Sequence, residues 1–168
     1  SQIMKAYLGI LVAAGVVLGM SSAVRAEDGA APAKGEKRAE KFGEIKEKRE
    51  AKHDQRMAEW QKKHDAHMAR LKDKLAGFKK LTDAEKEEII AFFETQYKEN
   101  VTFRNTQHEE NMKFLDELAA SPDLTKDQIK EKIKAHMATQ KGENKEHRAT
   151  QSGERKAEHT KIKAEKQD

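Results

Sequence analysis

Residues 81–120, LTDAEKEEIIAFFETQYKENVTFRNTQHEENMKFLDELAA, decide the fold of this 168-residue chain. Thr82 and Glu85 have the spacing of a capping box, in which each side chain accepts a hydrogen bond from the backbone N–H of the other residue. Apolar side chains then recur at steps of three and four, as on one face of a helix: Ile89, Ile90, Phe93, Tyr97, Val101, Met112, Leu115 and Leu118. Pro122 follows, and proline disfavours helical backbone at the residue before it. The segment therefore predicts one long helix.

The residues on either side predict two partner helices. Nothing breaks a helix between residues 36 and 78, and the second half of this segment has its own apolar face. Thr125 and Gln128 have the spacing of a second capping box, which opens a third helix. Short turns at residues 77–80 and around Pro122 connect the three helices. We therefore expect an all-α fold, an antiparallel hairpin of three long, thin helices.

The apolar faces also predict which residues are most buried. Each lies on a stripe that faces a neighbouring helix in such a hairpin. The set is Trp60, Leu71, Leu75, Phe78, Ile89, Phe93, Leu115, Ile129 and Ile133.

The C-terminal residues contain an internal repeat. Residues 139–145, TQKGENK, return as TQSGERK at residues 150–156, eleven residues later. An eleven-residue period is close to three helical turns, but the repeat is polar and contains Gly142 and Gly153. The sequence predicts that residues 141–168 form a polar tail that is either helical or disordered.

The first 26 residues have the pattern of a secretory signal peptide. Lys5 precedes an uncharged, mostly apolar run, and Val24 and Ala26, three back and one back from the break, fit a signal-peptidase site after Ala26. The apolar run is shorter than the ~20 residues that a membrane-spanning helix needs, so we expect no stable span after cleavage. Residues 27–35 predict a disordered linker and residues 36–140 a helical domain. Export without a single cysteine suits the periplasm of a Gram-negative cell.

Composition excludes several classes of function. The absence of cysteine excludes thiolate metal sites and cysteine nucleophiles. Outside the signal, basic and acidic residues nearly balance, with a net charge of about +2, which does not favour nucleic-acid binding. No nucleophile motif or glycine-rich phosphate loop is present. We therefore expect a binding or structural protein and not an enzyme.

The helix starts resemble those of a known family. Residues 81–85, LTDAE, resemble the Leu-Thr-x-x-Gln signature of the Spy/CpxP family of periplasmic proteins, with Glu85 in place of Gln. Residues 86–89, KEEI, and residues 135–140, AHMATQ, are also similar, so the resemblance covers roughly residues 81–140. Members of this family include ATP-independent chaperones, envelope-stress regulators and metal-binding sensors. The resemblance implies a role in envelope stress.

The sequence favours a chaperone that binds unfolded or misfolded envelope proteins through amphipathic helix faces. Methionine and aromatic side chains adapt to varied partners. The candidate client contacts are Met57, Trp60, Met68, Phe92 and Met112. Because the long first helix would leave its apolar face uncovered, a homodimer through this helix is a further expectation.

Three histidines suggest an alternative function. A turn near Lys80 places His53 level with His108, and a turn near Pro122 places His108 level with His136. Imidazoles, with methionines nearby, suit zinc, nickel or copper. The alternatives to the chaperone are therefore a periplasmic metal sensor or scavenger that uses His53, His108 and His136, and a structural coiled-coil protein of the envelope.

Overall fold

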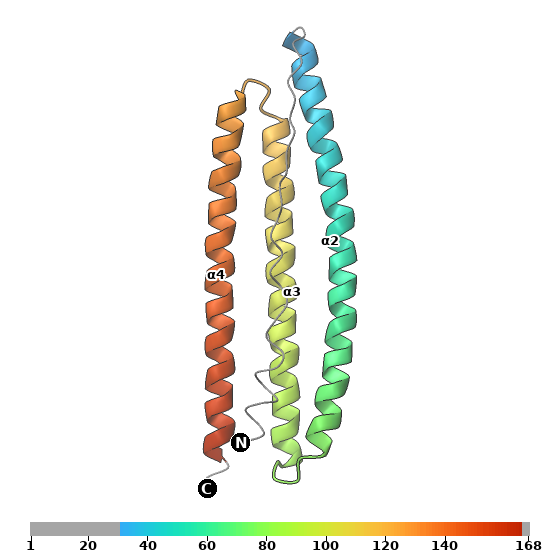
Figure 1. Ribbon diagram of the computed structural model, residues 1–168, viewed down its shortest axis with the longest axis vertical. Coiled ribbons are helices and arrows are strands. Elements are labelled where there is room, and N and C mark those ends of the chain that lie inside the picture. Colours follow the sequence, from blue (N-terminus) through green and yellow to red (C-terminus); the bar gives the residue numbers. More distant parts are fainter. Residues whose placement is uncertain (1–30, 166–168) are drawn as a thin grey trace.

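The computed structural model describes residues 31–165, which form three long α-helices. They are α2 (Ala31–Ala76), α3 (Asp83–Ala119) and α4 (Lys126–Glu165). Figure 1 shows them side by side and antiparallel in sequence order, with α3 between the other two. The predicted all-α hairpin of three helices is confirmed.

Both predicted capping boxes are present. Thr82 Oγ1 accepts from the N–H of Glu85 at 3.2 Å, and the Glu85 carboxylate accepts from the N–H of Thr82 at 2.6 Å. Thr125 and Gln128 repeat the arrangement at 3.3 and 2.8 Å. Such caps depend on residues three apart in the chain, so the sequence alone predicts them.

The helices extend further than predicted at both ends. α2 begins at Ala31, so residues 31–35 of the predicted linker are helical. The guanidinium of Arg38 donates to the carbonyl oxygens of Ser121 and Pro122, at 3.2 and 3.0 Å, which fixes the start of α2 against the α3–α4 loop. α4 runs through the predicted tail to Glu165. The predicted signal peptide, residues 27–30 and residues 166–168 lie outside the described residues.

The three helices form a bent layer and not a closed bundle. Within residues 31–165, no Cα atom of α2 lies within 8 Å of a Cα atom of α4. Gln107 faces α4 and the next residue, His108, faces α2. Consecutive residues of a helix point about 100° apart, so α2 and α4 do not lie on opposite sides of α3. We call the side of α3 that lies inside this angle, between α2 and α4, the groove.

The contacts between helices recur every eleven residues. His53 stacks on His108 with ring centroids 3.9 Å apart, and one repeat further His64 stacks on Tyr97 at 3.7 Å. An eleven-residue repeat has 3.67 residues per turn, close to the value for a straight helix. Residues eleven apart therefore keep the same neighbour. In the sequence, the eleven-residue repeat is visible as a repeated stretch of residues only in residues 139–156. In the structure, the same interval separates equivalent contacts in all three helices.

Apolar contacts are concentrated toward the two ends of the layer. Leu75, Leu81, Ile89 and Ile162 form a cluster beside the α2–α3 turn, and Leu118, near the other end, is 1% exposed. Of the residues predicted to be most buried, Leu75, Ile89 and Leu115 are buried and the others are half-buried. An open layer explains the difference, because each helix has a neighbour on only part of its surface.

The middle of the α3–α4 contact is polar. Gln96 and Gln151 are both 5% exposed, and each side-chain amide donates to the other residue's backbone carbonyl at 3.2 Å. Gln107 and Gln140, one repeat along, exchange the same bonds at 3.3 and 3.2 Å. These pairs satisfy polar groups that would otherwise be costly to bury.

Within residues 31–165, no helix combines the length and the apolar character that crossing a bilayer requires.

Candidate functional site

The groove along α3 is the first candidate site. Arg104 of α3 lies in it and donates to Asn144 of α4 at 3.0 Å. Burial lowers the pKa of the Arg104 guanidinium, and the nearby charges of Arg148 on α4 and Arg56 on α2 lower this pKa further. Cations from all three helices therefore face one another here. We call the side of the layer that carries Arg56, Arg104 and Arg148 the groove face.

Apolar side chains lie on the same side of the layer as these arginines, one repeat or one helical turn away along the helices. Phe93 is in contact with His67 of α2 at a centroid distance of 5.7 Å, and Trp60 meets Tyr97 edge to face at 5.6 Å. Ile133 and Met137 precede Asn144 and Arg148 by eleven residues, so they point to the same side of α4. Phe93, Trp60 and Ile133 are half-buried and Met137 is 44% exposed, so the groove is both basic and apolar.

The predicted client contacts divide into two groups. Met57, Trp60 and Phe92 are half-buried and partly accessible. Met68 and Met112 are 4% and 8% exposed, so they are core residues and are not available to a partner in this structure. The sequence indicates an apolar stripe at these positions but not which of its members a neighbouring helix covers.

The structure brings together two of the three predicted metal ligands. His53 stacks on His108 and lies 3.1 Å from Asn105 Oδ1. His136 instead stacks on Phe114 at 4.2 Å and binds Asn111 Oδ1 at 3.0 Å. It is therefore level with Asn111 and not with His108, because the α3–α4 loop sets a register three residues from the expected one. Among the described residues, no three His, Cys, Asp or Glu side chains gather as a metal site.

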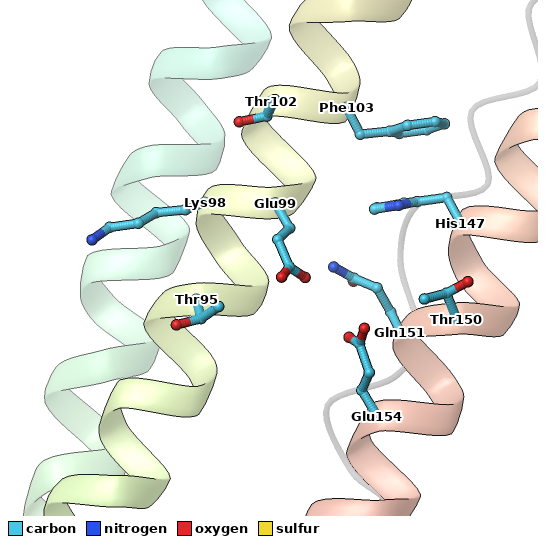
Figure 2. A pocket seen from close by; sticks show the side chains of 9 residues that line it. All are labelled: Thr95, Lys98, Glu99, Thr102, Phe103, His147, Thr150, Gln151 and Glu154. Carbon is cyan, nitrogen blue, oxygen red and sulfur yellow. The ribbon is translucent and has the colours of Figure 1, made fainter.

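A second candidate site lies between α3 and α4, on the side away from Arg104. Figure 2 shows the carboxylates of Glu99 and Glu154 pointing into the space between the two helices. Above them Phe103 stacks on His147, with ring centroids 4.1 Å apart. The open pocket has a volume of about 510 Å³. The pocket is lined by Thr95, Lys98, Glu99, Thr102, Phe103, His147, Thr150, Gln151 and Glu154.

Most of this lining is repeated eleven residues along both helices. Phe114 and His136 stack as Phe103 and His147 do. Five further lining residues have the same residue type one repeat away, at Thr106, Glu110, Thr139, Gln140 and Glu143, whereas Lys98 and Thr102 correspond to Glu109 and Lys113. This side of the layer therefore carries acidic residues at a regular interval.

Histidines lie in the α2–α3 contact and in the α3–α4 contact, and burial is the main cause of the shifts in their pKa. Burial lowers the pKa of His67, His108 and His147, and the electrostatic influence of a nearby basic side chain lowers it further: His64 for His67, His53 for His108, and Arg104 for His147. Glu50, Asp54 and Glu109 oppose the shift at His108, and Glu99 and Glu154 oppose it at His147. The folded chain therefore favours the neutral form of these three rings.

We expect stability to fall as the pH falls from about 7.5 to about 5. Below the usual histidine pKa of about 6.5 the unfolded chain binds protons that the folded chain does not, so protonation favours unfolding. Thermal unfolding followed by circular dichroism measures this slope. His108→Tyr should reduce it while keeping the ring stack, because Tyr97 already fills the equivalent position one repeat away. Equal melting temperatures at pH 7.5 and 5.5 would contradict the expectation.

Sequence reasoning missed the arginines of the groove and the glutamine pairs. A signal for the glutamine pairs exists in residues 92–118, where Phe92, Phe103 and Phe114 are eleven apart, as are Gln96, Gln107 and Leu118. The eleven-residue spacing identifies positions that face the same neighbour even where the residue type changes.

Comparison of the chain with protein-family models, with curated proteins and with solved structures gave no match.

Proposed function

We propose that this chain is an ATP-independent chaperone or envelope-stress protein of Spy/CpxP type, exported to the periplasm with cleavage after Ala26. The resemblance at residues 81–85 and the capped, charged helices support the proposal. Its partners are unfolded or misfolded envelope proteins, and it catalyses no reaction.

The open groove is the observation that carries this proposal. A closed three-helix bundle would bury its apolar faces, whereas here Trp60, Phe93 and Met137 retain accessible surface. Accessible apolar side chains beside solvent mark sites of interaction. Unfolded segments expose such side chains, so apolar contact with the groove is favourable for many different clients.

The arginines of the groove give the binding its second component. Arg49 and Arg104 are half-buried, and burial lowers the pKa of both guanidinium groups. Their charge attracts acidic segments of a client before apolar contacts form. Because neither step requires a fixed client sequence or an energy source, release follows from folding of the client.

Changes in the groove should weaken aggregation suppression. The variant Trp60→Ser/Met137→Ser removes one accessible apolar side chain from α2 and one from α4. We expect the concentration needed for half-maximal suppression to rise about tenfold, which corresponds to roughly 1.4 kcal/mol of lost binding. Light scattering from several unrelated unfolding clients, without nucleotide, measures this effect.

The matched control is Phe92→Ser. The sequence makes Phe92 a candidate client contact, but Phe92 precedes the pocket residue Phe103 by one repeat and so lies on the pocket side of α3, away from the groove. This variant should suppress aggregation nearly as well as the unchanged chain, with helix content monitored by circular dichroism. If the unchanged chain fails to slow the aggregation of every client, the chaperone function is excluded. If the Phe92 variant alone loses activity, clients bind elsewhere.

A further inference from the structure

Basic residues gather on the groove face to a degree that the net charge conceals. Lys41, Lys52, Lys63 and Lys74 are exposed and stand eleven residues apart on α2, one helical turn from the positions of Arg56 and His67. On α4, Lys130, Lys141 and Lys163 form a matching row beside Arg148. Among the described residues that point to the groove face, Glu59 on α2 is acidic, and so is Asp127 on α4, which forms an ion pair with Lys130 at 3.5 Å. The groove face is therefore strongly positive.

The opposite side of the layer, which we call the ridge face, has a surplus of acidic side chains, although Lys98 lines its pocket and Lys161 pairs with Glu88 there. Glu88, Glu99 and Glu110 are exposed and eleven residues apart on α3, pointing away from Arg104. Asp54 and Asp65 on α2 lie two residues before Arg56 and His67, about 200° around the helix from them. On α4, Glu154 lines the pocket in Figure 2, and Glu143 adds a carboxylate one repeat before it. A small net charge of +4 thus hides two faces of opposite sign.

The two faces match in shape and in spacing. The layer is bent about α3, so α3 projects on the ridge face, beside the pocket in Figure 2, and is recessed between α2 and α4 on the groove face. Rows of cations on one face and of anions on the other share the eleven-residue interval, which is about 16 Å along a helix. A ridge laid along a groove can therefore bring each lysine row near a row of carboxylates over the whole length of the helices.

We propose that the ridge face of one copy of this chain docks into the groove face of a second copy. We identify the partner as a second copy of this chain by charge complementarity. The ridge face of that copy has the opposite charge to the groove face, the same spacing of its charged rows and the complementary curvature. A two-fold symmetric dimer through either face would place like charges opposite one another, which is unfavourable. The docking is thus head-to-tail, and each added copy leaves one groove and one ridge free.

This inference does not depend on client binding. Copies joined in this way would cover the groove, so clients and a second copy would compete for the same surface. Its test is the state of association, which is measured without any client.

Sedimentation velocity of residues 27–168 at two ionic strengths tests the proposal. The Debye length is about 30 Å at 0.01 M salt and about 3 Å at 1 M. At low salt we expect the weight-average mass to increase with protein concentration, to roughly twice the monomer value or beyond, without a limiting dimer. At high salt the monomer should return. A monomer at all concentrations in low salt, or a closed dimer that persists in 1 M salt, overturns the proposal.

Charge reversal identifies the faces. Lys52→Glu/Lys63→Glu makes the groove face acidic, and Glu99→Lys/Glu110→Lys makes the ridge face basic. Each variant alone should remain monomeric, since both of its faces then have the same sign. An equimolar mixture should associate again, because each variant offers a face of opposite sign to the other. Failure of the mixture to associate contradicts head-to-tail docking.

The matched control changes the same charge on the other side of the same helix. Lys62→Glu/Lys72→Glu alters exposed lysines that lie on the side of Asp65, and it should leave association intact or strengthen it. Loss of association in this control would indicate a general effect of charge. Binding of the unchanged monomer to vesicles of anionic phospholipid, without self-association, would assign the groove face to a membrane surface instead.

Discussion

Replacement of Leu118 by Ala lowers the free energy of unfolding by about 3 kcal/mol, within the range measured for buried leucines. Leu118 is 1% exposed and stands near the end of α3, so its loss leaves a cavity where α3 enters the loop to α4. Small domains have a total stability of only about 5–15 kcal/mol, and this layer has few other fully buried side chains. Urea unfolding followed by circular dichroism measures the loss.

Met137→Ala is the control for this experiment. Met137 is 44% exposed, so its truncation removes little buried surface and should cost less than about 1 kcal/mol. A loss below about 1 kcal/mol for Leu118→Ala as well would mean that this end of the layer is not packed as described.

The second large effect is expected at the polar contact between α3 and α4. Gln96 donates to the Gln151 carbonyl oxygen at 3.2 Å and to Glu154 at 3.0 Å, and it accepts from Arg155 at 3.0 Å. Gln96→Ala leaves these groups without their partner in a buried position. Unsatisfied buried groups cost about 1–3 kcal/mol, so we expect a loss of about 2 kcal/mol in urea unfolding.

The double variant Gln96→Leu/Gln151→Leu should be less destabilising than Gln96→Ala. Replacing both members of a buried polar pair by apolar side chains leaves no glutamine amide without its partner and adds apolar contact. The other groups that lose a bond, on Asn100, Glu154 and Arg155, are half-buried and retain access to solvent. The chain makes a similar exchange itself, since Ile162 stands eleven residues after Gln151 and is buried. As a control, Gln55→Ala on the exposed surface should change stability by no more than about 0.5 kcal/mol. A double variant that costs the sum of the two single changes would contradict this account.

Features that depend on neighbouring residues were predictable from the sequence. Thr82 with Glu85 and Thr125 with Gln128 fix two helix starts through contacts within one turn. The sequence also predicts that His53 and His108 lie at the same height along their two helices, because the short α2–α3 turn leaves little freedom in how these helices align.

The candidate site was less predictable, because burial depends on which neighbour each face meets. Met68 and Met112 share an apolar pattern with Trp60, but only the packed helices decide that the two methionines are core residues. His136 was placed level with His108 because the geometry of the α3–α4 loop is not apparent in its residues, and the structure places it beside Asn111 and Phe114 instead.

The sequence by itself determined that this chain forms three capped, antiparallel helices, since helix propensity, capping and turns act over a few residues. Only the tertiary structure decided the bend of the layer and the division of its charge. Net charge is a sum over residues and has no direction. Lys52 and Asp54 are two residues apart, and they belong to opposite faces only because α3 fixes which side of α2 is turned toward the groove.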